Sequence, residues 1–532
     1  MSRAATSPTG ARRWAPTLRR RARVWAAREP ALIAATIATL ALYYVIPAPL
    51  LALPLLLAYA ALAWLRLDIA LATLPLSFPY WFVPKHIGGH AVLPLSEIAL
   101  GVCLAVALGY ELRHGWRLGG PRAWRCLARR LRALLARLGW PLALGALLLV
   151  AGATFGLLVA RRPPEALRAW RWEIVEPLLY LLLLLCYARG PRNMWRLVWA
   201  LLGSAVLLAA LATLQIAAWR VTFSPLAAGN RLIPLLPDGA GLLRATAFVY
   251  GSGNSLGAAL ERALPLALAL ALVPPRSGGV GRRARALALV VCLALLLALD
   301  WSGSRGAWVG AAIGVLVVIC LTLGRPWLLV VLAALGGLLA VWQRNQLIAL
   351  ALAGHNATGQ LRLLLWLAAW HMIRDHPLLG IGLDQFLYLY SNLYSSHPYW
   401  ITVLNGHPTI AGTQPNLAHP HNLLLDLWLS IGVLGLAGFL IVLGVVWRRC
   451  WHIWRAARRI PASARQRPAA VGAVALGIGA SLLAGIVHGM VDSAYFEPDL
   501  ALLFWASVAL LLLVSGRAGA PAPASDLVSD HQ

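Results

Sequence analysis

The stretch AHPHNLLLDLWLSIGVLG, residues 418–435, joins a polar turn to an apolar helix, and it decides how the chain is built. Two histidines flank Pro420, and an apolar run with recurring glycines follows. Proline suits the first turn of a helix, where its missing N–H group has no partner to lose. The pattern therefore predicts a membrane helix that begins at about His421, with the histidine at its polar end.

The apolar run places small residues on the same helix face as His421. Gly432 and Gly435 follow it at offsets that return to one side of a helix. Leu425 and Trp428 share that side, and the glycines allow a neighbouring helix to approach closely. The positive end of a helix dipole disfavours an imidazolium, which predicts a neutral His421 able to accept a proton. The alternative is a histidine that only anchors or caps its helix.

The composition of the chain is that of a membrane protein. Of its 532 residues, 60% are hydrophobic and only 12% are charged, and the mean hydropathy is +0.74. Soluble domains carry roughly twice that share of charge. Apolar stretches of about 20 residues, enough to span a bilayer, recur along the sequence. We therefore expect an all-α integral membrane protein, a polytopic bundle of about 12–14 transmembrane helices with a long external loop that contains short helices.

The basic residues lie in clusters between apolar stretches, which argues against a nucleic-acid partner despite a formal net charge of +28. The clusters fall at residues 12–28, 113–137, 276–285 and 448–467. Cationic loops mark the cytoplasmic side of a membrane protein and also contact anionic lipid headgroups. A cytoplasmic N-terminus makes all four clusters cytoplasmic. The arginines between residues 161 and 171 are the exception, because the same scheme places them outside.

The predicted organisation divides the chain into six segments. Residues 1–30 form an Arg-rich cytoplasmic tail, 31–194 the N-terminal transmembrane helices, 195–342 the central helices with external Arg-bearing loops, 343–420 a long external loop, 421–516 the C-terminal helices, and 517–532 a disordered cytoplasmic tail. The helices are predicted near 31–46, 48–64, 68–84, 91–110, 139–160, 172–188, 196–218, 253–274, 286–302, 305–323, 326–342, 421–447, 469–489 and 499–516. In the long loop, residues 359–377 are predicted to form an amphipathic helix at the membrane surface.

Two further arginines fall on the external side, next to predicted helices. Arg244 precedes a helix that carries Asn254, and Arg305 lies in the turn SGSRG between two apolar helices. An arginine at a membrane boundary needs a partner, by default a functional one. Its planar fork of donors fits phosphate oxygens. With a neutral base nearby, the two arginines suit a lipid-linked diphosphate and a hydroxyl acceptor; the alternative is that each pairs with a headgroup or a carboxylate.

Other chemistries find less support in the sequence. An external Asp-x-Asp pair, an HExxH motif, a zinc-type Cys/His spacing, a P-loop and a Rossmann fingerprint are all absent from it. We therefore expect no metal site and no cofactor, although the histidines of the long loop keep zinc as an alternative. A transporter of lipid-linked sugars is the competing class. Such a protein would show paired repeats and ionisable groups at mid-membrane, whereas the polar groups here gather at the external side.

The run HNLLLDLWLSIGVLG matches the pattern His-Asn, nine residues, Gly-x-x-Gly, and in this it resembles the bacterial O-antigen ligase and polymerase superfamily. Supporting stretches occur in the family's order: RATAFVYGSGN, SGSRGAW, RLLLWLAAWHMIRDHPLLGIGLDQF and GMVDSAYFEPDLALLFW. The resemblance covers roughly residues 195–515. It implies a GT-C-like glycosyltransferase in the bacterial inner membrane, with the active site facing the exterior.

The resemblance also implies a reaction and its residues. A glycan moves from undecaprenyl diphosphate to an acceptor sugar hydroxyl, without metal and with inversion. His421 would be the general base, and Arg244 and Arg305 would neutralise the leaving diphosphate. Substrate binding would involve Arg362, Asn254, Asn422 and His419. We favour His421 over His419 as the base because only His421 aligns with the motif.

The acceptor is left open by the sequence. Ligases and polymerases of this superfamily share the lipid-linked donor. They differ in the acceptor, which is a lipid-anchored core saccharide or protein for a ligase and a growing chain for a polymerase. The strength of the histidine motif slightly favours a ligase.

Overall fold

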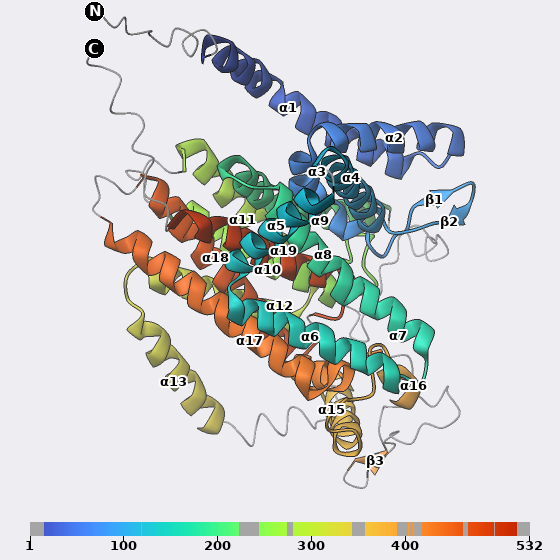
Figure 1. The fold of residues 1–532 in the computed structure, drawn as a ribbon. Coiled ribbons are helices and arrows are strands. Elements are labelled where there is room, and N and C mark those ends of the chain that lie inside the picture. Colours follow the sequence, from blue (N-terminus) through green and yellow to red (C-terminus); the bar gives the residue numbers. More distant parts are fainter. Residues whose placement is uncertain are drawn as a thin grey trace, which may run out of the picture.

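The structure of the protein is a computed structural model that describes residues 15–118, 120–222, 244–273, 280–342, 357–390, 403–404, 407–408, 418–460, 466–493 and 495–518. Most of these residues are helical, and the strands among them form two short hairpins (Figure 1). The prediction of an all-α polytopic membrane protein is confirmed. The start of the predicted N-terminal tail and nearly all of the predicted C-terminal tail lie outside the described residues.

The N-terminal part of the chain alternates long helices with short irregular ones. Its elements are α1 (Ala15–Val45), α2 (Pro49–Leu65), α3 (Leu67–Thr73), a 3₁₀ helix (Leu74–Tyr80), the hairpin β1 (His86–Ile87) and β2 (His90–Ala91), α4 (Leu95–Leu118), α5 (Gly120–Leu138), α6 (Trp140–Val159), α7 (Pro163–Ala169), a π-helix (Trp170–Val175), α8 (Glu176–Tyr187) and α9 (Pro191–Thr222).

The C-terminal part contains the longest helix and the segment predicted as an external loop. Its elements are α10 (Gly253–Ala271), α11 (Arg282–Ser302), α12 (Arg305–Thr322), α13 (Trp327–Trp342), α15 (Ala357–Asp375), α16 (Phe386–Tyr390), the hairpin β3 (Val403–Leu404) and β4 (His407–Pro408), α17 (Leu423–Arg459), α18 (Gln466–Gly489) and α19 (Pro498–Ala518).

Fewer helices than expected meet the requirements for crossing a membrane alone. Among the described residues eight are long and apolar enough, or nine if α2 and the following segment, bent by 115°, form one span. The sequence predicted about 12–14. The apolar part of α1 and the helix α13 are too short, and α10 carries the charged residues Glu261 and Arg262. Helix α8 continues α7 and the π-helix without a break over residues 163–187, a run that carries Arg171, Glu173 and Glu176.

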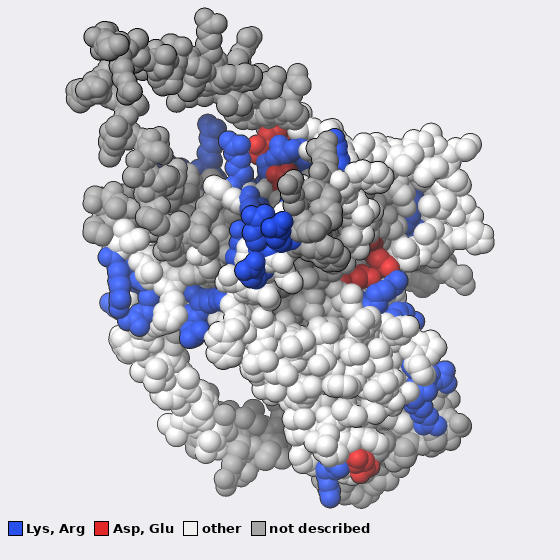
Figure 2. Space-filling model, viewed as in Figure 1, with Lys and Arg blue, Asp and Glu red and all other residues white. Residues whose placement is uncertain are grey.

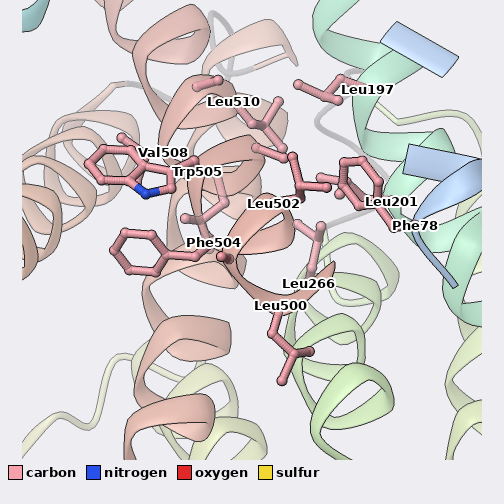
Figure 3. Close-up of a cluster of buried hydrophobic side chains, with 14 of the residues drawn as sticks. Phe78, Leu197, Leu201, Leu266, Leu500, Leu502, Phe504, Trp505, Val508 and Leu510 are labelled. Atoms are coloured by element: carbon pink, nitrogen blue, oxygen red, sulfur yellow. The ribbon is translucent and has the colours of Figure 1, made fainter. Parts of the chain in front are cut away.

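Helix α19 lies at the centre of the apolar core. Most of its side chains are buried, which is typical of a helix surrounded by others. Figure 3 shows Leu502 and Trp505 of α19 in one cluster with Leu266 of α10 and Leu201 of α9. This core connects helices that lie far apart in the sequence.

Helix α17 packs along α6 through glycines that leave no side chain between the two backbones. A Cβ atom at Gly152 of α6 would lie 2.4 Å from the carbonyl oxygen of Ile431 and 2.5 Å from the backbone nitrogen of Gly435. A Cβ atom at Gly438 would lie 2.5 Å from the backbone nitrogen of Leu149. Small residues at such contacts allow close packing of membrane helices. The close approach predicted at Gly435 therefore occurs, with α6 as the partner.

Contacts of two arginines place the basic end of α17 at one end of the bundle. Figure 2 shows Lys and Arg side chains in separate groups with uncharged surface between them. At the end of α17, Arg449 donates hydrogen bonds to the carbonyl oxygen of Leu138, and Arg458 donates to that of Leu321. These contacts place the basic end of α17 beside the end of α5 and the end of α12, opposite the end that carries His421.

Three of the arginines that depart from the predicted charge pattern, Arg162, Arg168 and Arg171, have carboxylate partners. Arg171 lies 2.8 Å from Glu97 and 3.4 Å from Glu176, and Arg168 lies 3.0 Å from Asp384. Their role in the fold is therefore to connect α7 and the π-helix to α4, α8 and the segment before α16. Pairing of this kind explains why they depart from the pattern of the other basic clusters.

The contact between α6 and α17 predicts a position-specific effect of adding one methyl group. Gly152→Ala should lower the free energy of unfolding by about 1–3 kcal/mol, because the added carbon overlaps the backbone of α17. The measurement is the thermal unfolding midpoint of the protein in detergent. Gly101→Ala in α4 is the matched control, since no atom lies within 4 Å of its added carbon. Equal midpoints for the two variants would contradict the packing described.

Candidate functional site

The start of α17 is fixed by Asn422, the residue before its first turn. The Asn422 side-chain oxygen accepts hydrogen bonds from the backbone N–H groups of Leu424 (3.1 Å) and Leu425 (3.2 Å). Its amide group donates to the carbonyl oxygen of Met490 (3.1 Å), at the end of α18. Asn422 is therefore an N-cap residue that also joins α17 to α18. Its predicted role in substrate binding stays a prediction.

His421 lies in the turn before the helix rather than in its first turn. The helix begins at Leu423, so the prediction that Pro420 occupies the first turn is wrong. The backbone of His421 has a φ of +52°, in the left-handed region that a residue with a side chain adopts at some cost. Such conformations persist where surrounding contacts hold them, and they recur at functional sites.

The contact that holds His421 is a carboxylate that the sequence did not single out. His421 Nδ1 lies 2.7 Å from Asp492 Oδ1, in the segment that follows α18. A donor N–H at Nδ1 leaves Nε2 able to accept a proton. Burial alone would raise the pKa of Asp492, but the hydrogen bond to His421 and the nearby charge of His488 lower it well below its usual range. Asp492 is therefore an ionised partner that orients the imidazole.

Asp492 was missed because its partner is 71 residues away in the sequence. Its only signal was its place in GMVDSAYFEPDLALLFW, one of the stretches that resemble the family. Nothing in the spacing of that stretch predicts which residue it contacts.

Arg244 is held at the junction between α10 and α11. Its Nε donates to the carbonyl oxygen of Ser302 (2.8 Å), and a terminal nitrogen donates to Asn254 Oδ1 (2.5 Å). Gly253 and Gly303 lie against the same guanidinium, where a Cβ atom would come within 3.1 Å and 3.0 Å of Nε. Asn254, predicted to bind substrate, is thus placed where it positions Arg244.

A break in α17 brings α15 to the site. Gly432 has a φ of +66° and interrupts the helix, and a Cβ atom there would lie 2.5 Å from the carbonyl oxygen of Leu378. The N–H of Val433 donates to that oxygen (3.0 Å), and the N–H of Ile381 donates to the carbonyl of Leu429 (2.7 Å). The predicted continuous face from His421 through Gly432 is therefore wrong, because the glycine admits a loop instead.

Arg362 lies within electrostatic range of Asp492, Arg305 and Arg244 at this end of the bundle. Arg362 of α15 is half-buried, and its pKa is lowered by burial and by the charges of Arg305 and Arg244, whereas Asp492 raises it. Arg305 is exposed at the first turn of α12. One turn after Arg362, the indole of Trp366 donates to the carbonyl oxygen of His421 (3.2 Å). The arginines and the His421–Asp492 pair therefore belong to one site.

His419 forms a separate pair on the other side of Pro420. Its Nδ1 lies 3.1 Å from Asp426 Oδ2, which also accepts a hydrogen bond from Ser493 (3.1 Å). Burial lowers the pKa of His419, but Asp426, together with Glu173 and Asp384, raises it to about 10. His419 is therefore an imidazolium at neutral pH and has no free lone pair to accept a proton. This distinguishes it from His421 as a candidate base.

The described residues contain no group of three or more His, Cys, Asp or Glu side chains that could hold a metal ion. Two histidines of the long predicted loop, His355 and His397, lie outside the described residues. In the part of that loop that the structure describes, residues 357–375 form the predicted helix α15, and one face of this helix packs against Leu429 of α17.

Part of the chain that carries the site matches a known protein family. Residues 287–440 match the model of a family described as O-antigen ligase. This match confirms the resemblance to the O-antigen ligase and polymerase superfamily. It includes Arg305, Arg362, His419, His421 and Asn422, whereas Arg244, Asn254 and Asp492 lie outside the matched range. A search of curated proteins found no match.

The charged state of His419 predicts a pH dependence of stability. A histidine with a raised pKa contributes stability that is fully present below its unfolded pKa of 6.5 and is lost as the pH rises towards about 10. The thermal unfolding midpoint of the wild type should therefore fall between these pH values more steeply than that of His419→Gln. Replacing the exposed His371 with Gln is the control and should keep the wild-type slope. Parallel curves for His419→Gln and wild type would refute a protonated His419.

Proposed function

We propose that this chain, with its O-antigen ligase match at residues 287–440, transfers a glycan from undecaprenyl diphosphate to the hydroxyl group of an acceptor sugar. The observation that carries the proposal is the convergence of the His421–Asp492 pair with Arg244, Arg305 and Arg362. A base and a cluster of guanidinium groups are the two parts that this reaction requires. They act on the incoming hydroxyl and on the departing diphosphate, respectively.

The base acts on the acceptor. The acceptor oxygen attacks the anomeric carbon of the donor glycan, and its proton moves to His421 Nε2 as the new C–O bond forms. Asp492 keeps the imidazole in the tautomer with Nδ1 protonated and stabilises the imidazolium that results. General base catalysis of this kind accelerates a reaction by about 100-fold to 10,000-fold.

The arginines act on the leaving group. As the bond between the anomeric carbon and the phosphate oxygen breaks, the electron pair remains on undecaprenyl diphosphate. Arg244, Arg305 and Arg362 provide fixed positive charge where this negative charge develops. Because guanidinium groups bind phosphate oxygens directly, the proposed reaction requires no metal ion. Displacement in a single step inverts the configuration at the anomeric carbon.

The proposed location is the external face of the bacterial inner membrane. The contacts of Arg449 and Arg458 put the basic end of α17 at the opposite end of the bundle from His421. Basic segments remain in the cytoplasm during membrane insertion, which supports an external His421. A lipid-linked glycan would reach the site from the surrounding bilayer.

Two alternatives remain, and each has its own discriminating observation. A polymerase would use the same donor and add repeat units to a growing chain. A transporter or flippase would move the lipid-linked glycan without cleaving it, and the paired ionisable groups inside the bundle, Glu261 and His488, are the feature that favours it. The arginine cluster at one end of the bundle favours transfer.

The proposal is tested with purified protein, an undecaprenyl-diphosphate glycan and a set of acceptor saccharides. Wild type should form a glycosylated acceptor, and His421→Ala should reduce the rate by about 100-fold or more. A single product indicates a ligase, and a ladder of products indicates a polymerase. Activity should persist in the presence of a chelator. Movement of the intact donor across vesicles, with no product from wild type, would support the transporter.

Arg305→Lys separates hydrogen-bond geometry from charge. Lysine retains the positive charge but loses the planar fork that holds two phosphate oxygens. We expect transfer to fall by about 10-fold to 100-fold, less than the roughly 100-fold to 1,000-fold for losing a charge-stabilising donor outright, because lysine keeps the positive charge. Arg459→Lys, at the exposed end of α17, is the matched control and should behave as wild type. Full activity of Arg305→Lys would mean that Arg305 only balances charge.

A further inference from the structure

A second histidine lies behind the His421–Asp492 pair, at the end of α18. His488 Nδ1 is 3.2 Å from Glu261 Oε1 of α10, and His488 Nε2 is 3.7 Å from Asp492 Oδ2. The His488 and Glu261 side chains are 2% and 0% exposed. The four groups form a row in which carboxylates and imidazoles alternate: Glu261, His488, Asp492 and His421. We call it the buried row.

The geometry of the buried row determines which protons it can hold. A neutral imidazole has one N–H group, so a neutral His488 donates to one carboxylate and turns a lone pair towards the other. An imidazolium turns an N–H group towards each carboxylate, at hydrogen-bond distance from Glu261 (3.2 Å) and at ion-pair distance from Asp492 (3.7 Å). Two anions on opposite sides also offset the cost of burying that positive charge. The arrangement therefore fits a positively charged His488 between two ionised carboxylates.

Helix α12 has glycines where His488 and Glu261 pack against it. A Cβ atom at Gly306 would lie 2.5 Å from His488 Cδ2, and one at Gly310 would lie 2.6 Å from Glu261 Oε2. The hydroxyl of Ser304, the N-cap of α12, lies 3.5 Å from His488 Nε2. The turn that carries Arg305 is thus packed directly on His488. Apolar residues would fill this space at lower cost, so a charged pair here calls for a functional explanation.

We propose that His488, held by Glu261, is a positioning residue that keeps Asp492 ionised and aligned for His421. The inference rests on the proposed function, in which His421 accepts the acceptor's proton. That proton stays on His421 Nε2 until the product leaves, and none moves to His488. His488 contacts neither substrate; it acts through Asp492, whose second oxygen faces it.

The charged groups around His488 determine what its removal does. Glu261 faces it from α10 and Asp492 from the segment after α18, Ser304 lies against it from α12, and Arg262 is the next residue after Glu261. The hydrogen bond of His421 and the nearby charge of His488 together hold the pKa of Asp492 well below its usual range. Without His488, Asp492 is protonated at a higher pH, and His421 then loses its ionised partner.

The kinetic test compares His488→Leu and His488→Gln with wild type in the transfer assay. His488→Leu should lower kcat by about 10-fold or more, the scale for groups that support a catalytic side chain, with KM changed less than about 3-fold. The acid limb of its pH profile should move to higher pH. His488→Gln retains a donor towards Asp492 and should recover part of kcat. In a variant that already carries Asp492→Asn, His488→Leu should cause no further loss of kcat.

A second measurement reads the protonation state of His488 without relying on transfer activity, so it remains informative if His488→Leu fails to fold. Wild type labelled with ¹⁵N-histidine should show an imidazolium signal by solid-state NMR that is missing from His488→Gln and retained in His371→Gln. The inference would be overturned if His488→Gln lost a neutral imidazole signal instead of an imidazolium signal. It would also be overturned by a His488→Leu variant that folds and keeps the wild-type kcat and pH profile. Wild-type transfer by His421→Ala would instead overturn the proposed function, so the two failures are distinguishable.

Discussion

The hydrogen bond between His421 and Asp492 is the interaction on which the rest of the site depends. It ties the turn before α17 to the segment after α18, and it holds His421 in a left-handed backbone conformation. Asn422 strengthens the same joint, because it caps α17 and donates to the carbonyl oxygen of Met490. Two adjacent residues therefore have separate roles: Asn422 fixes the helix, and His421 projects from it with one nitrogen held.

The arginines are placed relative to that joint by helices in unusually close contact. A Cβ atom at Gly253 would lie 2.3 Å from the carbonyl oxygen of Ser302, and one at Gly257 would lie 2.7 Å from the Cβ of Ala307. Helices α10, α11 and α12 therefore meet with almost no side chain between them, which fixes the positions of Arg244 and Arg305. Arg362 arrives differently, on α15, which docks where Gly432 interrupts α17. The glycines named here therefore position the arginines of the site as well as allow the helices to pack closely.

The sequence predicted the class of fold, and it singled out most of the residues of the proposed site, for reasons that are local. Apolar periodicity and charge clusters are properties of single segments, so they revealed the membrane helices and the helix α15. They could not reveal Asp492 or His488, because each acquires its role from a partner far along the chain. The surplus of predicted spans has a related cause. The apolar residues of α8 resemble a span in composition, but they end a helical run over residues 163–187 that also carries Arg171, Glu173 and Glu176.

The charges of the buried row and of the three arginines do not cancel within the proposed site. In the buried row, one imidazolium lies between two carboxylates, so the row carries a net negative charge until His421 gains a proton. Three guanidinium groups nearby leave an excess of positive charge, which Asp492 alone does not neutralise. A bound diphosphate would remove that excess, and its departure as a free anion would restore it. In the proposed reaction, the excess positive charge is therefore offset only with an anionic donor in place, and His421, as the proposed base, is most favoured to accept a proton when that donor is bound.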